Sequence, residues 1–202
     1  MSEAATLIYP TTTSAAEVEA APDAQADGCQ VAPTPALTLV YGALRGQGLL
    51  DSVLAECSNR PLERLDLPVL TALRLGAHQA LAMRVPPHAA VTTTVDLVAS
   101  RAASAAGFAN AVMRRVTASD AEGWIVRVAP SRERDPVGHL AVRHSHPRWI
   151  VEAFADALDG ALAEVEQLLI ADNAAPQVTL VARPGRADVA DLLAAGAGPA
   201  RF

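Results

Sequence analysis

Residues 68–116 read PVLTALRLGAHQALAMRVPPHAAVTTTVDLVASRAASAAGFANAVMRRV, and this stretch decides the fold. Its first third repeats apolar residues at offsets of three and four, the spacing of one helix face, at Leu70, Leu73, Ala77 and Leu81. The two prolines of the VPPH sequence end that helix, because proline lacks the amide N–H that would continue it. The stretch therefore predicts three packed helices, at about residues 67–84, 88–103 and 106–118.

Further helices are predicted on both sides of this stretch, at residues 37–57, 119–128, 147–158 and 161–172, with a brief helical turn at 139–143. Ser119 or Asp120 caps the helix that carries Trp124, because either side chain can accept a hydrogen bond from a free backbone N–H. Three glycines within 37–57 each cost on the order of 1 kcal/mol in a helix, which predicts close packing at those positions. Residues 177–182 (QVTLVA) predict a strand, and residues 188–195 a helix after it.

The composition favours helices packed closely together. Hydrophobic residues make up 51% of the chain, aromatic residues only 3%, and 44 residues are alanine. A core of alanine, leucine and valine suits helices better than a sheet. The two cysteines form no CxxC pair, the N-terminal residues lack the basic segment followed by an apolar one that is typical of a secretory leader, and no apolar run approaches 18 residues. We therefore expect a reduced, cytoplasmic protein without a membrane span.

Charge is distributed unevenly along the chain. The net charge is −6, and every one of the 16 basic residues is arginine. Residues 1–38 carry five acidic residues and no basic one, whereas residues 39–119 carry eight arginines and five acidic residues. Residues 120–202 carry eight arginines and twelve acidic residues. A nucleic-acid surface, if the protein has one, is therefore expected on the middle segment.

Four strings in the same order resemble the NusB-like RNA-binding domain at the front of Sun/Fmu-type ribosomal RNA small-subunit (cytosine-5) methyltransferases. They are LVYGALRGQGLLD, LRLGAHQALAMRVPPHAAV, GFANAVMRRV and HPRWIVEAFADAL. The resemblance covers about residues 37–184 and implies a mainly α fold. We expect a disordered, acidic Ala/Pro/Thr-rich tail at 1–36 and a NusB-like helical bundle at 37–130. A helical linker and the start of an incomplete α/β unit follow at 131–202.

The resemblance also implies what this chain lacks. Two further helices of the family's bundle would precede residue 37, and the sequence shows no pattern for them. In the family, the S-adenosylmethionine loop and the catalytic cysteines, in Pro-Cys and Thr-Cys contexts, lie beyond the residues that correspond to this chain. Neither Cys29 nor Cys57 has such a context. We therefore expect no catalytic residue and no cofactor site here, and no methyl transfer by this chain alone.

The remaining candidates for binding are arginines on the predicted helices or at their ends. We expect six of them to hold RNA phosphates, namely Arg45, Arg74, Arg84, Arg101, Arg114 and Arg115. For each one, a solvated charge or a charge that complements a helix C-terminus is an equally good explanation. Asn110 is expected to bond the backbone at its helix entry.

Two other patterns are weaker. The three histidines at 139, 144 and 146 suggest a metal with Cys57, but HPRW is a helix start in the family, so no metal is expected. The GQG triplet at 46–48 lacks the preceding strand and third glycine of a phosphate loop.

The leading functional hypothesis is the RNA-docking module of a ribosomal RNA cytosine-5 methyltransferase, cut off before the catalytic domain and binding ribosomal RNA. The alternative is a free-standing NusB-like module that regulates transcription by binding RNA and a protein partner. A third possibility is a decayed gene product without activity. Fold alone does not separate the first two, since similar folds carry different sites.

Overall fold

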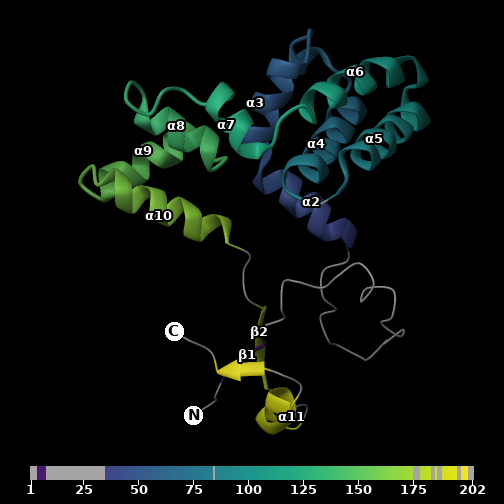
Figure 1. The fold of residues 1–202 in the computed structure, drawn as a ribbon. Helices are drawn as coiled ribbons and strands as arrows, with labels where there is room; N and C mark the ends of the chain where they lie inside the picture. Colours follow the sequence, from purple (N-terminus) through teal and green to yellow (C-terminus); the bar gives the residue numbers. More distant parts are fainter. Residues whose placement is uncertain are drawn as a thin grey trace. The chain divides into compact units, whose positions relative to one another are not determined.

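The computed structural model describes residues 4–7, 35–83, 85–174, 178–182, 185, 188–194 and 197–199. The chain divides into two compact units. One comprises residues 31–173 and is helical; the other comprises residues 1–30 and 174–202 and contains a small sheet. The expected mainly α fold is confirmed (Figure 1).

The first part of the helical unit is a bundle around one long helix, α4 (Leu67–Leu81). It packs against α2 (Pro35–Arg45), α3 (Gln47–Cys57), α5 (Pro87–Arg101) and α6 (Ala106–Val116). Short 3-10 helices, η1 (Leu62–Arg64) and η2 (Ala103–Ala105), precede α4 and α6. The three helices predicted from residues 68–116 are thus confirmed. Leu73, Leu54, Met113 and Val116 are fully buried and fill the bundle core.

A second core lies in the rest of the helical unit. The helices α8 (Pro136–Arg143), α9 (Arg148–Ala157) and α10 (Leu162–Asn173) enclose Leu140, Val151, Val165 and Leu169. Between the two cores runs α7 (Ala121–Val128), whose Trp124 packs in the bundle core and donates a 2.8 Å hydrogen bond from Nε1 to the carbonyl of Val116. Asp120 caps α7 as predicted, because its Oδ1 accepts from the N–H of Gly123 at 2.8 Å.

The prediction of one helix over residues 37–57 is wrong, because α2 ends before Gly46 and α3 begins after it. The break is held by Ser145, whose hydroxyl donates to the carbonyl of Gly46 at 3.2 Å and accepts from the N–H of Leu49 at 3.1 Å. The predicted close packing is confirmed at Gly42, where a Cβ would lie 2.2 Å from Nε2 of His78. It is confirmed at Gly48 as well, where a Cβ would lie 3.1 Å from Cα of Ser145.

The second unit contains the strand and helix predicted near the C-terminus, as β2 (Val178–Val181) and α11 (Val189–Ala194). The expectation that β2 begins an unfinished α/β unit is wrong. It pairs antiparallel with β1 (Ala4–Leu7), which also pairs antiparallel with β3 (Ala197–Pro199), so the strand order is β2-β1-β3.

The register of the sheet sets Ala4 opposite Val181 and Leu7 opposite both Val178 and Ala197. Disorder was therefore wrongly expected for residues 4–7, because backbone groups from the far end of the chain complete their hydrogen bonds. Residues 35–36 of the expected tail belong to α2, and the rest of that tail lies outside the described residues.

Candidate nucleic-acid interface

Two neighbouring arginines on α6 occupy different flanks of that helix. Successive residues of an α-helix are about 100° apart, so Arg114 and Arg115 cannot face the same neighbour. Arg115 turns toward α3, where its Nη1 donates a 3.0 Å hydrogen bond to the carbonyl of Cys57. Arg114 turns toward α5, and its Nε donates to Oδ1 of Asn110 at 3.3 Å. Asn110 therefore supports a side chain, and its predicted bond to the backbone is wrong.

The other predicted arginines are not gathered at one place. Arg74 forms a bidentate ion pair with Asp51, with both N···O distances at 2.7 Å, so its charge is neutralised inside the bundle. Arg45 ends α2 and donates from Nη1 to the carbonyl of Asn173 at 3.4 Å. Arg101 is exposed in the last turn of α5, and Arg84 lies outside the described residues.

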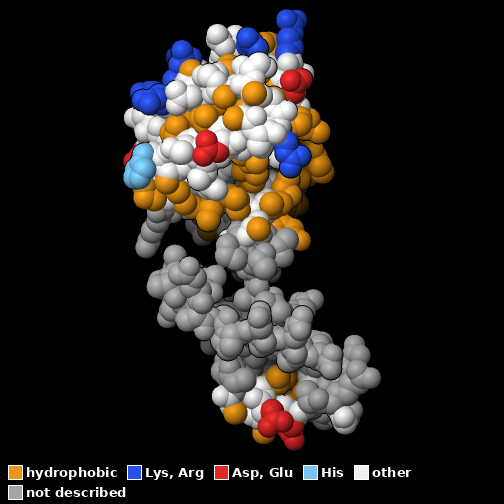
Figure 2. Space-filling view, turned by 90° about the vertical axis from the view of Figure 1, so that its right-hand side faces the viewer, with side chains coloured by type: hydrophobic (Ala, Val, Ile, Leu, Met, Phe, Trp, Pro, Cys, Tyr) orange, Lys and Arg blue, Asp and Glu red, His pale blue; other side chains and the backbone are white. Residues whose placement is uncertain are grey.

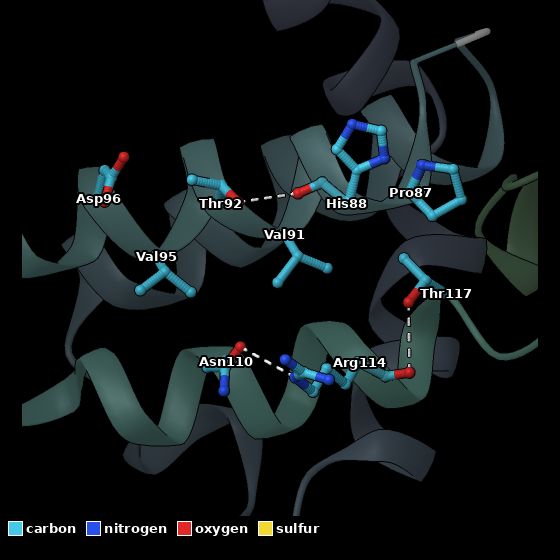
Figure 3. A pocket seen from close by; sticks show the side chains of 9 residues that line it. All are labelled: Pro87, His88, Val91, Thr92, Val95, Asp96, Asn110, Arg114 and Thr117. Atoms are coloured by element: carbon cyan, nitrogen blue, oxygen red, sulfur yellow. Dashed lines mark hydrogen bonds between the residues drawn. The ribbon is translucent and has the colours of Figure 1, made fainter.

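Arg114 borders a groove of about 350 Å³ between α5 and α6 (Figure 3). The α5 side supplies Pro87, His88, Val91, Thr92, Val95 and Asp96. The α6 side supplies Asn110, Arg114 and Thr117. Val91 and Val95 point from α5 toward α6, whereas Thr92 and Asp96 stand along the rim. An apolar floor with a polar rim is the usual form of a small-ligand site.

Sequence reasoning missed this groove because no single segment shows it. Val91 and Val95 sit four residues apart on α5, and Asn110 and Arg114 sit four residues apart on α6. Each pair marks one helix flank, but only the packing of α5 on α6 brings the two flanks together.

Two more arginines missed from the sequence lie against aromatic rings. The guanidinium carbon of Arg60 is 5.4 Å from the ring centroid of Phe108, and that of Arg127 is 5.2 Å from the centroid of Trp124. Contacts of this kind stabilise an arginine by about 0.5–1 kcal/mol when it is exposed. The only signal in the sequence would have been an arginine three residues from a tryptophan on one helix face.

The two halves of the helical unit differ in how many of their arginines form ion pairs. Among the described arginines of residues 39–119, only Arg74 pairs with a carboxylate. In residues 120–173, three arginines are paired: Arg132 with Glu166, Arg143 with Glu122, and Arg148 with both Asp135 and Glu152. Figure 2 views the side on which α5 and α6 lie in Figure 1, and arginines gather along its upper edge. Most of the described arginines that lack a carboxylate partner therefore lie in the bundle.

The structure provides no support for covalent catalysis by Cys57. Its thiol is buried, and burial raises its pKa to about 11, although Arg115 and Arg127 act in the opposite direction. A catalytic cysteine requires a lowered pKa, because the thiolate is the nucleophile. Cys29 lies outside the described residues.

The three histidines considered for a metal are engaged separately. Nδ1 of His139 lies 3.0 Å from the carbonyl of Pro130, and Nδ1 of His146 lies 2.8 Å from the carbonyl of His144. No group of three potential ligands occurs within the described residues. The GQG triplet spans the α2–α3 break, where Gly48 packs on Ser145.

Comparison with known proteins bears on this interface. The sequence model of the NusB family matches residues 15–118. A candidate methyltransferase of Mycobacterium tuberculosis strain H37Rv is 46% identical over 151 residues, covering 74% of this chain and 33% of that protein. The ribosomal RNA small subunit methyltransferase B of Pseudomonas putida is 32% identical over 143 residues, covering 70% of this chain and 30% of that protein.

The protein of the same name from Thermus thermophilus is 40% identical over 116 residues, covering 57% of this chain and 24% of that protein. The chain thus spans about a third or less of the length of these relatives. No solved structure matches it. Among the helices of the described residues, none has the length and apolar character to cross a bilayer.

Proposed function

Because the chain belongs to the NusB family, we propose that it is a non-catalytic RNA-binding module that docks on folded ribosomal RNA. The relatives named ribosomal RNA small subunit methyltransferase B support ribosomal RNA as the target, and favour this function over free-standing regulation of transcription. In this proposal, residues 37–130 bind RNA and the helices after them form a linker. Methyl transfer and its S-adenosylmethionine cofactor belong to a catalytic domain outside this chain.

The observation that carries the proposal is the unequal pairing of arginines in the two halves of the helical unit. An arginine already held by a carboxylate gains little from a phosphate, because it must give up one charge-assisted bond to make another. On the bundle, Arg101 and Arg114 are exposed without a carboxylate partner among the described residues. Arginine is also the side chain best suited to bidentate recognition of phosphate.

The non-catalytic part of the proposal rests on Cys57. At neutral pH a thiol with a pKa of about 11 is almost entirely protonated, and this one is buried in the bundle core. The sulfur of Cys57 is therefore neither ionised nor accessible, and an attack on a cytosine ring requires both.

Filter binding to a structured fragment of small-subunit ribosomal RNA across a salt series tests the proposal. We expect affinity to fall with salt, and Arg114→Ala to reduce the slope of log K against log salt by about 1, because one phosphate contact is lost. Arg134→Ala is the matched control, since it removes an exposed arginine from the other half of the unit. Arg115 is unsuitable for this test because it also holds the end of α3.

The proposal fails if the wild-type chain shows no salt-dependent binding of this RNA. Equal slopes for the wild type and the Arg114→Ala variant would remove Arg114 from the interface.

A further inference from the structure

Hydrogen-bond donors line the α6 wall of the groove between α5 and α6. The Nε of Arg114 is occupied by Asn110, but within the described residues its two Nη groups have no bonded acceptor. The same holds for the amide nitrogen of Asn110, because only its Oδ1 is engaged. Three donor nitrogens on this side therefore have no acceptor among the described residues.

Acceptors stand along the rim of the groove on α5. The hydroxyl of Thr92 donates its proton to the carbonyl of His88 at 3.0 Å, so its oxygen can only accept from a ligand. Asp96 is exposed and forms no ion pair with any described residue, Arg114 included. The groove thus has donors on α6 and acceptors along its rim on α5 (Figure 3).

The floor between α5 and α6 is apolar. Val91 and Val95 are half-buried and face α6, so a flat ring laid on them would be shielded from water on one side. The volume of about 350 Å³ lies at the lower end of the range for small-ligand pockets and suits one nucleotide better than a duplex.

Among the RNA bases, guanine best matches this polarity. Its O6 and N7 accept hydrogen bonds along one edge, and arginine bound to this pair of atoms is the commonest specific contact to a base. Its N1–H and 2-amino group donate along another edge, which a carboxylate can accept. Uracil has no amino group, and adenine has no edge with two adjacent acceptors. Pairing would occupy the donor edge, so only an unpaired guanine offers both.

We infer that the groove between α5 and α6 binds one unpaired guanine of an RNA strand, with Arg114 on the acceptor edge and Asp96 on the donor edge. This inference rests on the proposed RNA-binding function and adds base selection to it. Val91 and Val95 support the ring, and Asn110 holds Arg114 in place through its Oδ1.

Fluorescence anisotropy with the whole chain of 202 residues and labelled uridine dodecamers tests which base the protein prefers. The central residue is guanosine, inosine or uridine, and inosine differs from guanosine only by lacking the 2-amino group. We expect the guanosine strand to bind about tenfold more tightly than all-uridine, within the range of one bidentate base contact. The inosine strand should fall between them.

The Asp96→Asn variant tests whether the preference for guanosine comes from the groove or from the overall charge of the protein. It should reduce the guanosine advantage to about twofold or less, because the amide offers one acceptor where the carboxylate offered two. Asp156→Asn is the matched control, since it removes the same charge from an exposed position on α9, and it should keep the advantage. Asp96 is exposed and bears no described ion pair, so the variant should fold, as circular dichroism would verify.

The outcomes separate the two proposals. Salt-dependent binding with equal affinity for the guanosine and uridine strands overturns the guanine site and leaves the proposed RNA binding intact. The same result is expected if the groove binds a protein segment instead of a base. A guanosine advantage that survives Asp96→Asn overturns the role of Asp96 and with it the site. No binding to any strand or to the ribosomal RNA fragment overturns both proposals.

Discussion

Replacing Gly76 by alanine should destabilise the protein, although alanine is the better helix former. Gly76 is buried in α4 at its contact with α5, which carries one wall of the groove. A Cβ at this position would lie 2.0 Å from Oγ1 of Thr94 and 3.0 Å from both its Cβ and its Cγ2. Rotating Thr94 about χ1 does not relieve the contact, because its Cβ stays 3.0 Å from the new Cβ in every rotamer. The two helices must move apart.

The free-energy balance follows from three effects. Overpacking a close contact of this kind costs about 1–3 kcal/mol. Disturbing the 2.7 Å hydrogen bond from Oγ1 of the buried Thr94 to the carbonyl of Ala90 costs about 1 kcal/mol more. The gain in helix propensity is about 1 kcal/mol in the opposite direction. We expect Gly76→Ala to lower the free energy of unfolding by about 1–3 kcal/mol.

Gly107→Ala is the matched control. This glycine lies in the first turn of α6, and no described atom would come within 4 Å of the new Cβ. It should stabilise the protein by about 0.5 kcal/mol through propensity alone. In addition, Thr94→Ala removes two of the three clashing atoms, so the double variant with Gly76→Ala should be more stable than the two single effects predict.

Urea unfolding followed by circular dichroism at 222 nm measures all four proteins, with a common m-value as the check on two-state behaviour. Stabilisation by Gly76→Ala equal to that by Gly107→Ala would refute the close approach of α4 and α5.

Two further predictions concern buried titratable groups. In a Cys29→Ser background, Cys57 should react with iodoacetamide at pH 8 only as fast as the protein unfolds, because its pKa of about 11 leaves about one thiol in a thousand ionised; a rate typical of an exposed thiol would contradict its burial. Burial also lowers the pKa of His144, outweighing the opposing effect of Glu166, whose Oε1 lies 3.5 Å from the buried Nε2. The unfolded chain therefore binds a proton more readily, so stability is full above pH 6.5 and should fall as the pH drops below it. The pH dependence of urea unfolding should be shallower in His144→Gln, and an unchanged slope would show that His144 is not its source.

Local sequence patterns predicted the elements whose causes are local. The apolar spacing in α4, the proline pair before α5 and the cap at Asp120 each act within a few residues, and the structure contains all three consequences. The break at Gly46 depends on Ser145, about a hundred residues away, and β1 depends on β2 and β3 at the other end of the chain. Periodicity carries no information about such partners, so these features could not be predicted.

In the candidate site, Arg114 and Arg115 show the same difference between what local sequence predicts and what distant partners decide. Helical spacing predicts that Arg114 and Arg115 both leave the core, which is correct, yet it does not say what each one meets. One meets the carbonyl of Cys57 and fastens α6 to α3, whereas the other meets only Asn110 and keeps its Nη groups at the rim of a groove. Charge counted along the sequence therefore overstates what is available to RNA, since Arg74 and Arg115 already have partners within the bundle. Arg114 is the arginine proposed to bind RNA, because its only described hydrogen bond comes from Asn110 on its own helix and leaves its Nη groups without a described partner.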